Sequence, residues 1–357
     1  MGKYVLDGTC HPSSSNSSDS VTGPVQDSEV QTTLVPRSPT VPLERLAALE
    51  AKVARAVTQS RAASTMRAYR SDWTDFSLWC GGLGLDALPA APATIAAYIA
   101  ELADPGDDRS PAAVATITRR LAAIGEAHKL AGHVSPCGEA LVRETMKGIR
   151  RTLGIAQRQK KPVTTADIRA AVPRLPLTVQ GDRDRVVLLL GFASGMRRSE
   201  LAGLDVEDLE AVPDGLLVHL GRSKTDQEGR GRRVEIVYGT DTATCPVTAV
   251  RTWLTRSGFT TGALLRPVDR HGRVLPHRLT GQGVALVVKR HMSALGHPTG
   301  DFAGHSLRRG LATTAARNGA SERTIMRTTG HTSVETVRSY IDDAELFTDP
   351  ASKYLGL

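Results

Sequence analysis

The sequence is poor in aromatic residues and in cysteine. Only 4% of its 357 residues are Phe, Trp or Tyr, and its four cysteines are Cys10, Cys80, Cys137 and Cys245. They lie far apart, with no C-x-x-C pair and no His at zinc-ligand spacing, so we expect free thiols and no metal site. No run approaches the ~18 apolar residues of a membrane span, and the N-terminus lacks the order of a signal peptide. These absences predict a cytoplasmic protein without a membrane partner.

The chain carries an excess of basic charge. Lys and Arg number 45 against 37 Asp and Glu, which gives a formal net charge of +8. Such a balance favours a polyanionic partner that is bound through its phosphates, although basicity alone does not separate nucleic acid from an anionic membrane. The length allows two domains of ordinary size.

The first part of the chain changes character near residue 42. Residues 1–41 are dominated by Ser, Thr and Pro and are predicted to form a disordered arm. Apolar residues at helical spacing then predict an all-helical domain over residues 42–158. Its expected helices are one from Leu43 to Val57, one capped by Ser64, one over 93–102, one that begins at Ser110-Pro111, and one over 138–153.

A basic run leaves this helical domain. Residues 147–161 hold six basic side chains and no acid, and residues 159–163 are predicted to be a linker that lies on a phosphate surface. In the second domain, residues 164–357, Thr165 is expected to cap a helix and 184–193 to form an apolar helix. Two strands, 215–221 and 233–237, are expected to form a hairpin. The predicted fold is mainly α with a small β-hairpin or sheet: a helical domain followed by a mixed α/β domain.

Five separated segments of the second domain carry side chains that could take part in catalysis. Each is weak evidence alone, because Arg–Glu surface pairs, exposed lysines and H-x-x-R are all common; His219 and Arg222 form a second H-x-x-R on a strand. The five segments are, in order, Arg197 with Glu200, Lys224 in the hairpin, His305 with Arg308, His331, and Tyr340 nine residues later.

The order of these five segments resembles the tyrosine recombinase (phage integrase) family. Its members carry an Arg followed three residues later by an acid, a hairpin Lys, H-x-x-R, a His or Trp, and a nucleophilic Tyr. The resemblance covers residues 164–345 firmly and the helical domain more loosely. It implies a Cre-like architecture, with a core-binding (SAM-like) DNA-binding domain over 42–158 and a catalytic domain of the DNA breaking-rejoining type over 164–357.

The resemblance also implies a division of chemical roles. Tyr340 attacks a DNA phosphate and leaves a 3′-phosphotyrosine, while Lys224 protonates the departing 5′-oxygen. Arg197 and Arg308 bind the two non-bridging oxygens, since a planar guanidinium matches phosphate geometry.

Three further residues complete the implied site. His305 is expected to assist the tyrosine as base or hydrogen-bond partner, since free tyrosine has a pKa near ~10. His331 is expected to hydrogen-bond the phosphate, and Glu200 to orient the arginine and histidine network. Because the phosphotyrosine retains the energy of the cut bond, no ATP, metal ion or cofactor is expected.

The implied partner is double-stranded DNA, bound in the nucleoid by a homotetramer on two DNA sites, with accessory DNA-bending proteins as further candidates. The tail after Tyr340 is expected to dock either on a neighbouring subunit or on its own domain. The candidate DNA-contacting residues are Arg67, Arg70, Arg119, Arg120, Lys147, Arg150, Arg151, Lys160 and Lys161.

Other functions share parts of this pattern. A type IB topoisomerase uses a similar residue set, but the compact helical domain and basic linker favour an integrase, and a telomere resolvase usually carries large extra domains. A catalytically inactive DNA-binding regulator remains the alternative from another class. The sequence leaves open the target site and the choice between integration, excision and resolution.

Overall fold

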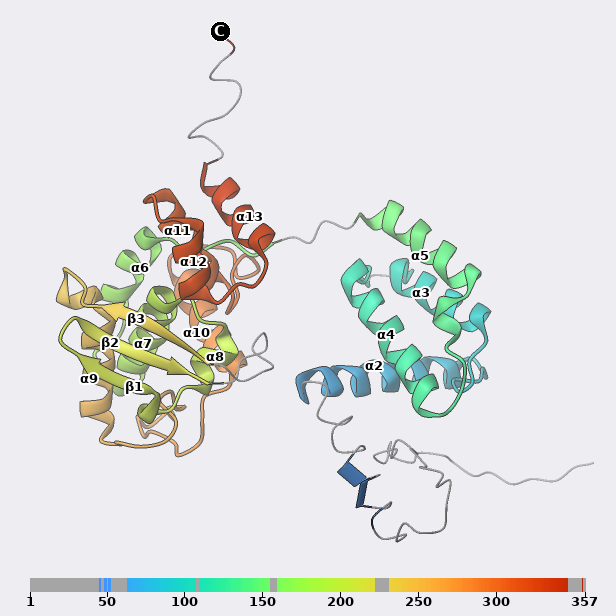
Figure 1. Cartoon of the computed structure of the whole chain (residues 1–357), viewed down its shortest axis with the longest axis horizontal. Helices are drawn as coiled ribbons and strands as arrows, with labels where there is room; N and C mark the ends of the chain where they lie inside the picture. Colours follow the sequence, from blue (N-terminus) through green and yellow to red (C-terminus); the bar gives the residue numbers. More distant parts are fainter. Residues whose placement is uncertain are drawn as a thin grey trace, which may run out of the picture. The chain divides into compact units, whose positions relative to one another are not determined.

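The computed structural model describes residues 63–106, 109–154, 159–221 and 231–345, together with Arg45, Ala48, Leu49, Ala51, Lys52 and Leu355. It divides the chain into two compact units, Met1–Gln157 and Arg158–Leu357 (Figure 1). The predicted arm, most of the helix predicted from Leu43, and Lys224 lie outside the described residues. Within the described ranges, no helix is both long and apolar enough to cross a membrane.

The first unit is a helical bundle. α2 packs against α4, and α3 packs against α5. The helices are α2 (Ala63–Gly82), α3 (Pro92–Ala103), α4 (Val114–Leu130) and α5 (Ala140–Leu153), with a short 3-10 turn, Pro136–Gly138, before α5.

Aromatic residues, scarce in the whole chain, gather in the core of this bundle. Phe76 is fully buried and Tyr98 almost so, and their ring centroids lie 5.0 Å apart in an edge-on arrangement. Trp73 and Trp79 flank Phe76 at 5.7 and 6.4 Å. Large rings bury much apolar surface per residue, so a few of them stabilise a small bundle effectively.

Two predicted helix starts in this unit are wrong. Ser64 was expected to cap α2, but it lies inside the helix, which includes Ala63. Ser110 was expected to cap α4, but the helix begins later, with Ala113 as its N-cap and no side-chain capping bond. The physical reason is a tertiary bond: Ala112 N donates to Leu102 O at 2.8 Å, so this N–H is committed to the end of α3 before α4 begins.

The second unit combines helices with one small sheet. α7 occupies its centre and packs against α9, α10 and α11. The elements are α6 (Thr165–Ala171), α7 (Val179–Ser194), α8 (Arg198–Gly203), β1 (Leu209–Val212), β2 (Gly215–Leu220), β3 (Arg232–Val237), α9 (Pro246–Ser257), α10 (Gly281–Ala294), α11 (Ser306–Arg317), α12 (Glu322–Thr329) and α13 (Val334–Glu345). The cap of α6 is Thr164 and not the predicted Thr165, because Asp167 N donates to Thr164 Oγ1 at 3.1 Å in a capping box.

The sheet is an antiparallel meander in the order β1-β2-β3, drawn in yellow-green to yellow in Figure 1. The predicted hairpin strands are confirmed as β2 and β3, and Val218 pairs with Val234. β1, which the sequence did not indicate, adds an edge in register with β2. Leu216, Val218 and Leu220 are buried on one face, as alternation along a half-buried strand requires.

His128, in the core of the first unit, generates a stability prediction. Its side chain is fully buried; Nδ1 donates to Ile124 O at 2.8 Å, and Nε2 accepts from Ala90 N at 2.9 Å. His128→Leu leaves the Ala90 N–H without its partner and removes the side-chain bond to Ile124 O, so it is expected to lower the stability of this unit by about 1–3 kcal/mol. Hydrogen exchange measured by mass spectrometry should show faster opening of α4 peptides and unchanged α7 peptides. His133→Leu, at an exposed position nearby, is the control, and equal exchange in both variants would contradict the prediction.

Candidate active site

Arg308, in the first turn of α11, is the centre of the candidate site. Its side chain is completely buried. Nη1 donates to Gly195 O at 2.9 Å and also to Thr329 O, while Nε donates to His331 Nε2 at 3.3 Å. Those two carbonyls belong to the C-terminal ends of α7 and α12, where helices leave acceptors without intrahelical partners. One guanidinium therefore joins the ends of two helices.

Both helices end at a glycine in the left-handed conformation. Gly195, with φ 58°, follows α7, and Gly330, with φ 67°, follows α12. A Cβ at Gly195 would lie 2.4 Å from Leu311 Cδ2, and one at Gly330 would lie 2.9 Å from Arg232 Nε. A larger residue at either position would be strained by the positive φ and would require the side chain of Leu311 or Arg232 to shift.

Glu200, in the first turn of α8, is shared by two arginines. Arg197 Nη1 donates to Glu200 Oε1 at 2.6 Å, and the Arg197 backbone N donates to Oε2 at 2.9 Å. Arg232 Nη2 also donates to Oε2 at 2.9 Å. Burial alone would raise the pKa of Glu200, but the Arg197 amide and the charges of Arg232 and Arg197 outweigh it and lower the pKa. The sequence correctly predicted Arg197 and Glu200 as neighbours.

Arg232 is a residue of this network that sequence reasoning missed. It begins β3, and its Nη1 donates to Thr328 O near the end of α12. Within the described residues its buried Nε has no hydrogen-bond partner. An arginine at the start of a strand gives no periodic or motif signal, so only the tertiary structure identifies it.

His331 is held in one tautomer. Its Nε2 accepts from Arg308, so Nδ1 carries the proton and donates it to Thr329 Oγ1 at 2.7 Å. That hydroxyl in turn donates to Ile325 O at 2.6 Å. Burial, together with the charges of Arg308 and Arg197, lowers the pKa of His331 to about 3. The ring is therefore neutral at physiological pH.

His305 and Arg308 lie close in sequence but differ in exposure. His305 is the N-cap residue of α11 and is exposed, whereas Arg308 is buried. Partial burial and the charges of Arg308, Arg197 and Arg198 lower the pKa of His305. A neutral imidazole at the surface of the site has the protonation state that a base requires.

Tyr340 lies on α13 and packs against α11. Tyr340 is 7% exposed and packs in a small apolar cluster with Ala312, Ile325 and Val337. Its ring centroid is 5.6 Å from that of His331, at an interplanar angle of 55°. The structure thus brings Tyr340 beside His331, which contacts Arg308. Lys224 falls between β2 and β3, outside the described residues.

Two of the candidate DNA-contacting arginines form internal pairs. Arg119 Nη2 lies 3.0 Å from Asp72 Oδ1, so it joins α4 to α2. Arg120 Nη1 pairs with Asp75 and also donates to Tyr98 Oη, and its side chain is only 18% exposed. These contacts stabilise the bundle.

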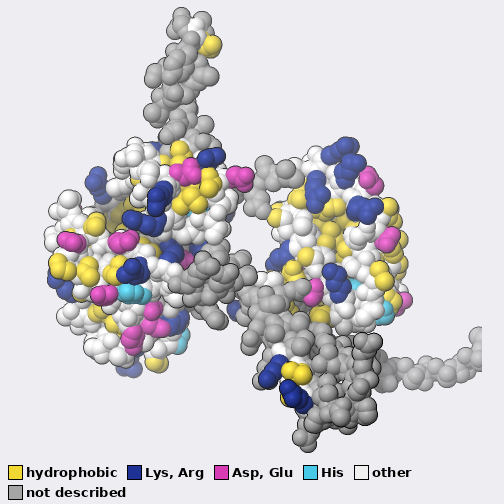
Figure 2. Space-filling model, in the orientation of Figure 1, with side chains coloured by type: hydrophobic (Ala, Val, Ile, Leu, Met, Phe, Trp, Pro, Cys, Tyr) yellow, Lys and Arg dark blue, Asp and Glu magenta, His cyan; other side chains and the backbone are white. Residues whose placement is uncertain are grey.

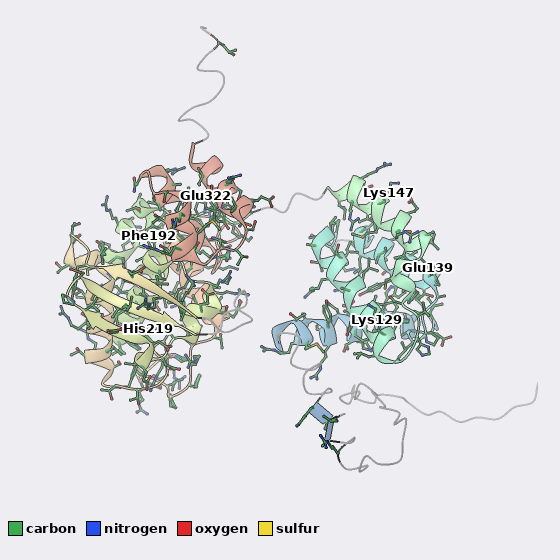
Figure 3. All side chains as sticks on the ribbon, in the orientation of Figure 1. Lys129, Glu139, Lys147, Phe192, His219 and Glu322 are labelled. Atoms are coloured by element: carbon green, nitrogen blue, oxygen red, sulfur yellow. The ribbon has the colours of Figure 1, made fainter. Side chains whose placement is uncertain are left out.

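The other candidates of the first unit are exposed. Arg67 and Arg70 lie on α2. Basic side chains gather where Figure 1 places α5, on the face drawn in Figure 2, and there Lys147, Arg150 and Arg151 are exposed. Lys147 projects away from its own bundle in Figure 3.

The chain is similar to known proteins of one family. The family model "Phage integrase family" matches residues 170–346. An integrase/recombinase xerD homolog of Selenomonas ruminantium is 38% identical over 307 residues, which cover 85% of this chain and 88% of that protein. A tyrosine recombinase XerD of Corynebacterium glutamicum is 27% identical over 296 residues, covering 80% of this chain and 89% of the relative.

Solved structures share the fold. A lambda integrase dimer bound to a COC′ core site matches with a TM-score of 0.52 at 16% identity, over 85% of this chain and 78% of that one. A XerH site-specific recombinase bound to palindromic difH substrate matches with a TM-score of 0.51 at 15% identity, over 74% and 72%. The chain belongs to the tyrosine recombinase (phage integrase) family.

Glu200 provides a prediction on stability and pH. Glu200→Gln removes the negative charge between Arg197 and Arg232, so we expect a loss of about 1–3 kcal/mol at neutral pH. The folded-state pKa of Glu200 is lowered from 4.5, so its stabilisation is complete above that pH and declines as pH falls through the folded pKa. Urea denaturation at pH 7 and at progressively lower pH should show the two proteins converging. A constant difference across that range would contradict the assignment.

Proposed function

We propose that the protein cuts and rejoins DNA at specific sites through a covalent bond between Tyr340 and a 3′-phosphate. Site-specific DNA recombination is the reaction of the family to which the chain belongs. One observation carries the residue assignment: Arg308 is wholly buried, and its Nη2 has no hydrogen-bond partner among the described residues. A buried cationic donor without a partner is costly unless an anion binds it.

The charge balance around Arg308 supports a phosphate ligand. Arg197 and Arg232 pair with the carboxylate of Glu200, which also attracts the charge of Arg308 without an ion pair among the described residues. Burial, and the repulsion of Arg197, lower the pKa of Arg308 to about 10, so it remains charged at physiological pH. The uncompensated positive charge stabilises both the bound phosphodiester and the extra charge that develops as it is attacked. Arg308 and Arg197 are the proposed ligands of the non-bridging oxygens.

The histidines have separate proposed tasks. His305, neutral and exposed at the start of α11, accepts the proton of the attacking tyrosine. His331 donates its one N–H to Thr329, so it has no proton for a phosphate until one is gained. A bound phosphate anion offsets the arginine charges that lower the pKa of His331, so binding and protonation are coupled.

Lys224 is the proposed general acid for the departing 5′-oxygen. A lysine suits this task because its ammonium sits on a long stem and carries three donors. Glu200 positions Arg197 and has no direct part in proton transfer.

DNA is held, in this proposal, by exposed basic residues of both units. In the first unit these are Arg67, Arg70, Lys147, Arg150 and Arg151. A role for Arg120 in DNA contact would require its internal pairs to break. Exchange between two duplexes needs two cuts on each, which four subunits acting together supply. Accessory DNA-bending proteins and a place in the nucleoid belong to the same proposal.

Two of the relatives are named as recombinases, which favours this reaction over DNA relaxation by a type IB topoisomerase. A test begins with a pool of nicked duplexes that carry a randomised core. Full-length protein is incubated with the pool, and covalent complexes are recovered under denaturing conditions. The recovered sequence defines the substrate for every later measurement.

Tyr340→Phe is expected to abolish the covalent complex and to leave DNA affinity within about twofold, because affinity comes from many phosphate contacts and one hydroxyl adds little. Denaturing gels and fluorescence anisotropy on the recovered duplex measure the two quantities. Tyr238→Phe, at an exposed position, is the matched control. Covalent product from Tyr340→Phe would show that another residue is the nucleophile.

Lys224→Ala is expected to slow cleavage of an ordinary phosphodiester but to be much less impaired on a substrate with a bridging 5′-sulfur. A thiolate leaves without a proton, so it does not need a general acid. Arg197→Ala is expected to show no such rescue. Equal impairment of Lys224→Ala on both substrates would make Lys224 a phosphate ligand and not the acid.

A further inference from the structure

The linker segment, residues 159–163, lies along the loop that leads into α11. Lys161 N donates to Asp301 O at 2.8 Å, and Lys161 Nζ pairs with Asp301 Oδ2 at 2.8 Å. Two residues later, Val163 N donates to Ser306 O at 3.0 Å. The linker segment is thus fixed to the start of the helix that carries the buried arginine of the site.

The backbone of the linker segment also contacts the backbone of α11 directly. A Cβ at Gly310, in the second turn of α11, would lie 2.0 Å from Val163 O. No side chain fits between the two segments at this point. A change in the course of the linker segment must therefore displace α11 or break these contacts.

Arg309 connects this contact to the candidate nucleophile. Its Nη1 donates to Lys160 O at 2.8 Å. Its Cζ also lies 5.7 Å from the centroid of the Tyr340 ring, within the range of a cation–π contact. One guanidinium therefore contacts both the linker segment and the tyrosine.

The proposed mechanism gives Arg309 no task, because it assigns the phosphate to Arg308 and Arg197. The linker segment begins two residues after the first unit ends at Gln157.

We propose that Arg309 is a positioning residue that ties the linker segment to Tyr340, so that the placement of the nucleophile depends on the course of the linker. This inference rests on the proposed function of Tyr340. Lys160 contributes only its backbone carbonyl, which every residue type has. The contact between the linker segment and Tyr340 therefore depends on the side chain of Arg309. In this proposal, engagement of DNA by the first unit determines the course of the linker segment, and that course determines the placement of Tyr340.

The first test measures single-turnover formation of the covalent complex at saturating DNA, together with DNA affinity. Arg309→Met keeps the stem but loses the hydrogen bond and the charge, so we expect cleavage to slow about tenfold with affinity unchanged; a misplacement of ~1 Å can cost about 100-fold. Arg309→Lys keeps the charge and is expected to recover most of the rate. Arg317→Met, exposed in the last turn of the same helix, is expected to match the wild type.

The second test asks whether the linker segment acts through Arg309. Asp301→Asn weakens the attachment of Lys161 and is expected to slow cleavage severalfold in the wild-type background. In the Arg309→Met background the same change is expected to add little, because the connection to the tyrosine is already cut. Thermal unfolding of each variant establishes that it is folded at the assay temperature.

The outcomes separate the two proposals. A wild-type rate for Arg309→Met, or independent and multiplicative effects of the two substitutions, overturns the positioning role. Slow cleavage in Arg309→Met that is fully explained by weaker DNA binding also overturns it. Absence of any covalent complex with the wild type, or its persistence in Tyr340→Phe, overturns the proposed function instead.

Discussion

The second unit depends on the burial of one guanidinium. Arg308 is inaccessible to solvent, and it hydrogen-bonds the last carbonyls of α7 and α12 and the ring of His331. Removing a charge from water costs several kcal/mol, which its partners must offset. The negative ends of two helix dipoles supply part of that compensation. Because both bonds of Nη1 reach backbone carbonyls, the ends of α7 and α12 are fixed relative to each other. The remaining Nη2 has no hydrogen-bond partner among the described residues.

Several local features follow from this constraint. Helices that must present their terminal carbonyls to one arginine end abruptly, and Gly195 and Gly330 supply the left-handed turns. A second cation close to Arg308 requires a carboxylate, which Glu200 supplies to Arg197 and Arg232. The carboxylate does not neutralise all three arginines, and burial together with the residual positive charge lowers the pKa of His305 and of His331. A site with excess cationic charge and neutral histidines is arranged for an anion that arrives from outside.

The sequence predicted the parts of the fold that local pattern determines. Apolar periodicity located α3, α5, β2 and β3, because burial on one face imposes that period. The capping signal at Ser110-Pro111 was wrong for the start of α4, where Ala112 instead bonds to Leu102. In the site, the resemblance predicted that the five segments converge. The structure pairs Arg197 with Glu200, bonds Arg308 to His331 and packs His331 against Tyr340, while Lys224 lies outside the described residues. The sequence pattern gave no sign of Arg232 or Arg309, because an arginine's partners are backbone carbonyls distant in sequence.

The sequence also did not separate the basic residues of the first unit that contact DNA from those that form internal ion pairs. Arginine binds a phosphate and a carboxylate with the same fork of donors, so sequence does not distinguish an arginine that contacts DNA from one that joins two helices. Arg120 illustrates the second case, since it pairs with Asp75 and Tyr98 inside the bundle. Arg309 is a similar case in the second unit. It lies next to Arg308, yet its Nη1 donates to a backbone carbonyl of the linker segment. Its guanidinium also contacts the ring of Tyr340, so under the proposed positioning role the placement of the tyrosine depends on the linker segment.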